Sequence, residues 1–171
     1  APDDSDSDET FHRVFGPNYY SFDYGNAHFI ALDDINWQRP ERQTTGSYTA
    51  ALDEEQLTFI KNDLSLLPPD QMVVLMMHIP LTEITNRQDL YRLIEQRPLC
   101  VSISGHTHFQ EHRFIGKEDG WQGAEPHHHI VNLTVSGSWW RGQKDELGIP
   151  HTMMRDGAPN GYSVMTFDRE S

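Results

Sequence analysis

The sequence predicts a layered α/β protein, because strand-like apolar runs alternate with segments of helical periodicity. Residues 72–77 and 99–103 have the length and composition of buried strands, and segments 53–64 and 87–95 have the pattern of helices. The order strand, helix, strand, helix, strand favours a sheet covered by helices. With 171 residues, the chain can bury a real core and forms one domain or part of one.

The composition is acidic, with 26 acidic against 13 basic residues and a net charge of −13. This balance repels polyanions, so we expect no nucleic-acid partner. We expect residues 1–16 to be irregular, with a solvated acidic opening. No apolar stretch is long enough to span a bilayer, so we expect no membrane segment. Cys100, the only cysteine, lies in an apolar run, so we expect a core residue. The compartment stays open, and a secreted or periplasmic location would require a signal peptide upstream of residue 1.

The first strands are predicted at 19–24 and 27–32, joined by the hairpin signal Gly25-Asn26. Asp33 and Asp34 end the second strand. Paired carboxylates can serve acid–base chemistry or bind metal, but we favour solvation of a strand end for Asp34. The twenty residues that follow are predicted to form a surface loop.

The helix at 53–64 has a clear beginning. Asp53 is a good N-cap, and Gln56, three residues later, would complete a capping box. Leu57, Ile60 and Leu64 recur at helical spacing and should face the sheet.

Three histidines follow two apolar runs at the point where each run ends. His78 comes after residues 72–77, and Pro80 discourages further pairing there. His106 and His108 follow the run at 99–103, with Gly105 available for a sharp turn at positive φ. Ligand sites in open α/β sheets gather at the carboxyl ends of strands, so these histidines suggest a metal site.

The second half of the chain lacks helical periodicity, and we expect antiparallel sheet there. Residues 109–115 alternate loosely, and strands are predicted at 130–135 and 162–167. For His127 to His129 we favour an exposed, weakly metal-scavenging cluster; if they begin a strand, the first and third share one face. Trp139, Trp140 and Arg141 could line a substrate pocket, with Arg141 gripping phosphate, and core packing of the tryptophans is an equal alternative.

The pattern V-L-M-M-H-I-P at His78, followed by G-H-T-H at 105–108, resembles the C-terminal half of the calcineurin-like metallophosphoesterases. The stretches F-G-P-N-Y-Y-S-F-D-Y-G-N-A-H-F-I-A-L-D and L-D-E-E-Q-L-T-F-I-K-N-D-L also agree with that family. The resemblance implies a four-layer α/β/β/α sandwich, with two mixed sheets flanked by helices.

The resemblance also implies a function, namely metal-dependent hydrolysis of a small phosphoester. His78 and His106 would bind one metal ion and His108 the other. Imidazole suits Zn, Fe and Mn alike, so the residues do not choose between these metals. In such a dinuclear centre, a bridging water becomes a hydroxide near neutral pH, and the metal ions hold the substrate.

The sequence departs from the family in lacking D-x-H, G-D-x-x-D and G-N-H, the motifs that supply the remaining ligands and the catalytic histidine. We therefore expect residues 1–171 to be the C-terminal portion of a catalytic domain, with the catalytic histidine upstream of residue 1. Its partner would be the missing N-terminal half. Alone, the chain would have a partial or empty metal site and be inactive. The alternative is a non-catalytic binding or structural module of the same fold.

Overall fold

A computed structural model describes residues 9–38 and 47–167 of the chain. The elements, in chain order, are α1 (Glu9–Phe15), β1 (Tyr20–Tyr24), β2 (Ala27–Ala31), β3 (Ile35–Gln38), β4 (Ser47–Ala50), α2 (Glu54–Ser65), β5 (Met72–Met76), the 3₁₀ turn η1 (Leu81–Glu83), α3 (Arg87–Ile94), β6 (Cys100–Ser104), β7 (Glu111–Ile115), the 3₁₀ turn η2 (Lys117–Asp119) and β8 (His127–Val131). The predicted α/β class is confirmed, and in the described residues no helix has the length and apolarity that a bilayer-spanning segment requires.

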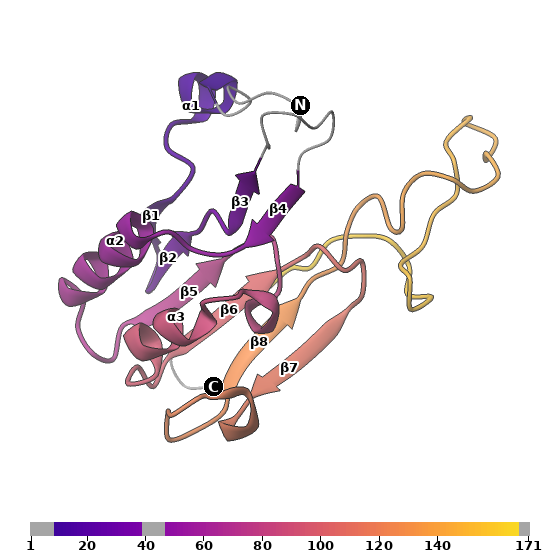
Figure 1. Cartoon of the computed structure of the whole chain (residues 1–171). Coiled ribbons are helices and arrows are strands. Elements are labelled where there is room, and N and C mark those ends of the chain that lie inside the picture. Colours follow the sequence, from indigo (N-terminus) through magenta and orange to yellow (C-terminus); the bar gives the residue numbers. More distant parts are fainter. Residues whose placement is uncertain (1–8, 39–46, 168–171) are drawn as a thin grey trace.

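A mixed six-stranded sheet forms the centre of the fold, in the order β1-β2-β5-β6-β8-β7 (Figure 1). The four middle strands are parallel, and β1 and β7 pair antiparallel at the two edges. The strands that precede His78 and Gly105 are therefore direct neighbours, as predicted. The expectation of purely antiparallel sheet after His108 is wrong, because β8 pairs parallel with β6.

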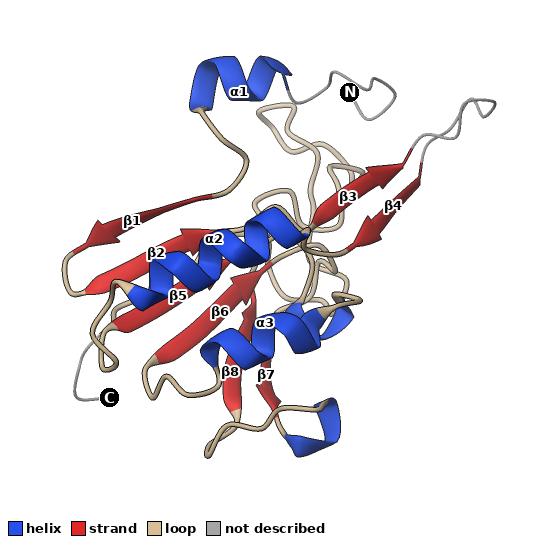
Figure 2. Cartoon of the chain, turned by 60° about the vertical axis from the view of Figure 1, so that its left-hand side comes forward, coloured by secondary structure: helices blue, strands red, loops and turns tan. Residues whose placement is uncertain are grey.

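Helices α2 and α3 lie on the same face of this sheet (Figure 2). Ile60 and Leu64 of α2 pack there with Ile30 and Leu75, within one apolar cluster that also holds the buried side of α3. This cluster is the main core, and burial of its side chains drives the docking of both helices.

The predicted N-cap of α2 is confirmed, because the Asp53 carboxylate accepts a hydrogen bond from the Gln56 N–H at 2.7 Å. The capping box is not, because the Gln56 side chain turns to the sheet instead. Its amide accepts from the Asp33 N–H and donates to the Asp33 carbonyl, both at 2.8 Å. The buried Gln56 therefore fastens α2 to the end of β2.

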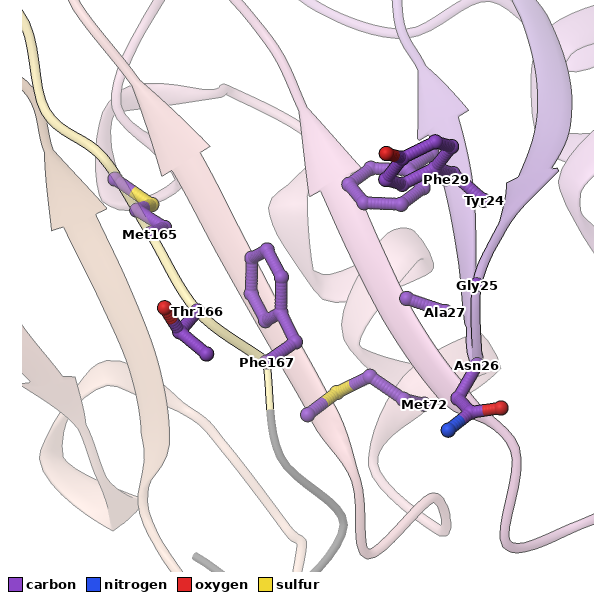
Figure 3. A pocket seen from close by; sticks show the side chains of 9 residues that line it. All are labelled: Tyr24, Gly25, Asn26, Ala27, Phe29, Met72, Met165, Thr166 and Phe167. Carbon is purple, nitrogen blue, oxygen red and sulfur yellow. The ribbon is translucent and has the colours of Figure 1, made fainter.

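The opposite face of the sheet has no helices over it among the described residues. We call it the open face; Ala27, Val74 and Val101 are buried on it, with Phe29 and Phe167 beside them. A cavity of about 420 Å³ lies between the β1–β2 turn and residues 165–167, and Figure 3 shows the Phe167 ring beside this cavity. The strand predicted at 162–167 does not form, because this segment crosses the open face without pairing to a neighbour.

Two segments predicted to be irregular are ordered. Residues 9–15 form α1, in which the Phe11 and Phe15 rings lie one turn apart, tilted by 41°, with their centroids 5.1 Å apart. The predicted surface loop instead contains the antiparallel pair β3–β4. Residues 1–8 and 39–46, also covered by those predictions, lie outside the described residues.

Candidate metal centre

The carboxyl ends of β5 and β6 bring His78 and the 105–108 loop together. Backbone hydrogen bonds between the two chain segments continue past the ends of the strands. The Met77 N–H donates to the Ile103 carbonyl, and the Gly105 N–H donates to the His78 carbonyl at 3.1 Å. Because the parallel strands end side by side, the side chains that follow them share one edge of the sheet.

At this edge His78 Nε2 lies 3.1 Å from His106 Nδ1, and the two rings meet at 72°. Partial burial, and then the charges of His106 and His108, lower the pKa of His78. The His78 imidazole is therefore neutral at pH 7, which is the form that binds metal. The third expected ligand, His108, lies in the same loop as His106, and its charge also contributes to lowering the pKa of His78.

His108 is buried, and its Nδ1 has no hydrogen-bond partner among the described residues. A buried ring nitrogen without a partner is costly, so this atom suits a ligand that arrives from outside. The backbone that follows the His108 ring is held by a segment distant in the sequence: Arg155 N–H donates to the His108 carbonyl, and Gln110 N–H donates to the Asp156 carboxylate, both at 2.9 Å.

The backbone of the 105–108 loop is strained at its two histidines and not at its glycine. His106 and His108 have φ of 67° and 60°, and Trp139 has 73°; these are all the non-glycine residues at positive φ in the described chain. Gly105, which was available for this conformation, does not adopt it. Left-handed backbone costs such residues about 1–3 kcal/mol each and is commonly found at functional sites.

Asp34 does not have the solvated position at a strand end that was predicted for it from the sequence. It is buried at 1% exposure and does not solvate a strand end. Its two oxygens accept the N–H groups of His78 at 3.1 Å and Ile79 at 2.6 Å. Burial raises the pKa of this carboxyl, and the two backbone bonds oppose that rise. Asp34 therefore fixes the backbone that presents His78.

Trp139, Trp140 and Arg141 lie on the long excursion after β8, which extends away from the sheet in Figure 1. The Trp139 ring lies 5.0 Å from the His108 ring. Trp139 is 54% exposed and Trp140 46%, so the alternative that they are core residues is wrong. Trp139 thus borders the candidate metal centre, while a substrate-binding role stays a prediction.

The histidines at 127–129 do not form the exposed cluster that the sequence favoured. His127 and His129 share the helix-covered face of β8, as alternation requires, and both are buried. Ser102 Oγ lies between them, 2.8 Å from His127 Nε2 and 2.7 Å from His129 Nδ1, and Ser104 Oγ lies 2.9 Å from His129 Nε2. Burial is the main cause that lowers the pKa of His127 to about 4 and of His129 to about 3.

The donor set fits a metal ion only in part. Two imidazole nitrogens face each other and a third is buried without a partner, which is suitable chemistry for zinc, iron or manganese. Over the described ranges, however, no three histidine, cysteine or acidic side chains are grouped closely enough to hold an ion by themselves. The described residues could therefore supply only some of the ligands that a metal ion needs.

A mixed α/β sheet with histidines at adjacent strand ends presents them where ligand sites of open α/β sheets gather. Residues 129–171 match the family model described as the C terminal of calcineurin-like phosphoesterase, which confirms the resemblance and supports a phosphoesterase-type hydrolase at family level. Trp139, Trp140 and Arg141 lie inside the matched residues, whereas His78, His106 and His108 precede them. No curated protein matches the chain.

Proposed function

We propose that this chain carries part of the active site of a metal-dependent phosphoester hydrolase. The observation that carries the proposal is the approach of His78 Nε2 to His106 Nδ1, 3.1 Å apart at the ends of neighbouring parallel strands. The unpartnered, buried Nδ1 of His108 and the match of residues 129–171 support it.

His78 and His106 would hold one metal ion and His108 a second. Bound ions would polarise the phosphoester and lower the pKa of a water molecule toward neutrality. The roles of the remaining residues follow from their contacts. Asp34 fixes the loop of His78, and Trp139 covers one side of His108. These contacts hold the rings in place before any ligand arrives, which lowers the cost of binding.

The substrate would lie beside Trp139, Trp140 and Arg141. The exposed indole faces provide an apolar surface, and the Arg141 guanidinium can donate two parallel hydrogen bonds to a phosphate. A small phosphoester has a group for each of these: its phosphate would bind Arg141, and its organic substituent would contact the indole faces.

The remaining ligands would come from an N-terminal half of the domain, in a four-layer sandwich of which residues 1–171 form the C-terminal part. The open face supports this arrangement. It carries a continuous apolar strip over four strands, and at its edge Phe22 is 41% exposed and stacks on Phe29 at 5.0 Å. A second sheet packed there would bury this strip.

The test begins with the encoded sequence upstream of Ala1. We expect D-x-H and G-D-x-x-D motifs there, and we expect the protein that contains them to hydrolyse p-nitrophenyl phosphate or its diester with Mn²⁺, Fe²⁺ or Zn²⁺. His106→Asn should lower kcat/KM by more than about 100-fold, beyond what an outer-shell change costs. His12→Asn, which changes an exposed histidine of α1, is the matched control.

Equal activity of the His106→Asn and His12→Asn proteins would contradict the proposal. Absence of the acidic motifs upstream, together with no hydrolysis of either ester, would select the non-catalytic module instead.

A further inference from the structure

We propose that His112 and His128 form a second metal-chelating pair, separate from the strand-end histidines, that takes a divalent first-row transition ion such as Zn²⁺, Ni²⁺ or Cu²⁺. The pair lies on β7 and β8, the last two strands of the sheet. Neither residue belongs to the candidate metal centre or to the segment matched by the family model.

The register of the strands puts both side chains on the open face. His128 pairs with Val101, which is buried on that face, and Phe114 is the cross-strand partner of His128. His112 lies two residues before Phe114 and therefore on the same face. The pair lies diagonally across an antiparallel ladder, a separation that long side chains can bridge.

The two rings are already close to the geometry of a chelate. His112 Nδ1 lies 2.8 Å from His128 Nε2, with ring centroids 5.0 Å apart. Metal–nitrogen bonds of about 2.1 Å at a tetrahedral centre place two nitrogens about 3.4 Å apart. An ion could thus replace the shared proton if the two nitrogens moved apart by about 0.6 Å.

The surroundings hold the His128 ring in place and leave the pair open to solvent. The Phe114 ring stacks on His128 at 4.8 Å and 12°, which limits rotation of the His128 ring. His112 is exposed on the edge strand β7, which contributes no residue to the apolar strip of the open face, so water can reach the pair and fill the remaining coordination positions.

The position of the pair separates it from the first site. His128 is the second residue of β8, whereas His78 and His106 follow the carboxyl ends of β5 and β6, which run parallel to β8. About the length of a strand therefore lies between the two sites.

The experiment is calorimetric titration of the 171-residue chain with Zn²⁺, in a His106→Asn background that disables the strand-end histidines. We expect about one equivalent to bind. Adding His112→Asn should weaken that binding by about tenfold or more, since even outer-shell changes cost this much. Adding His12→Asn, the matched exposed control, should leave it unchanged.

Cu²⁺ electron paramagnetic resonance on the same proteins gives a second measure, with two nitrogen couplings expected in the background protein and one after His128→Gln. The proposal is overturned if the background protein binds no Zn²⁺, or if His112→Asn titrates like His12→Asn. Because no readout depends on hydrolysis, a failure here is distinct from failure of the proposed function.

Discussion

The buried histidines of β8 make the stability of this protein sensitive to acid. The Leu81 N–H donates to His129 Nε2 at 3.4 Å, so that nitrogen carries no proton, and Nδ1–H must donate to Ser102. Ser102 O–H then donates to His127 Nε2. Each imidazole is held in one neutral tautomer, and protonating His129 Nε2 would place its new N–H against the Leu81 N–H, so that two donors face each other.

The magnitude follows from the pKa values of the two rings. In the unfolded chain a histidine titrates near 6.5, whereas His127 and His129 have pKa values of about 4 and about 3 when folded. Below pH 6.5 the unfolded state therefore binds more protons, and stability falls as pH falls. When the pH falls from 7.5 to 5, each ring lowers the free energy of unfolding by about 2 kcal/mol, and the pair lowers it by about 4 kcal/mol. Asp34 works in the opposite sense, because its pKa is raised in the folded state.

Urea unfolding at pH 7.5 and 5.0 measures this difference, and at a slope of about 2 kcal/mol per M the midpoint should fall by about 2 M. The reference is the His12→Asn variant, which should show the same fall. Imidazole NMR shifts provide the direct check: His127 and His129 should not titrate between pH 8 and 5. Equal midpoints at the two pH values, with either ring titrating near pH 6.5, would refute the reasoning.

Four further variants test other parts of the fold and site. Asp34→Asn should lower stability by about 1–3 kcal/mol, since one buried N–H loses its acceptor, and should weaken Zn²⁺ binding at His78; unchanged thermal unfolding and Zn²⁺ titration would contradict this. Leu75→Ala, at a fully buried position, should cost about 2–5 kcal/mol in urea unfolding, and a cost below 1 kcal/mol would argue against the described core. Trp140→Ala and Arg141→Ala should each lower kcat/KM of the complete enzyme with Tm unchanged; a lower Tm with normal turnover would assign them to packing.

The elements with strong local signals could be predicted from the sequence. The strands before His78 and Gly105 are continuous apolar runs, and α2 begins at a recognisable cap, so their type and order were correct. The hairpin at Gly25-Asn26 formed for the same reason. By contrast, residues 162–167 have strand-like composition but no strand to pair with, and composition alone does not make a ladder.

The parts of the site that sequence reasoning missed depend on distant partners. Asp34 is 44 residues from His78, and nothing beside it in the sequence indicates that its oxygens will meet two backbone N–H groups. For His127 and His129, alternation predicted that they share a face. Only the pairing with Ser102 and Ser104 on β6 decides that this face is buried.

The central claim is that His78 and His106 are metal ligands, and it is tested most directly by ring-nitrogen NMR during a Zn²⁺ titration of the protein that also contains the proposed N-terminal ligands. We expect the ¹⁵N signals of His78 Nε2 and His106 Nδ1 to shift together and to saturate, because these two atoms face each other 3.1 Å apart. The exposed His12 should show no matching response. If both signals keep their positions at saturating Zn²⁺, the strand-end histidines do not form a metal site.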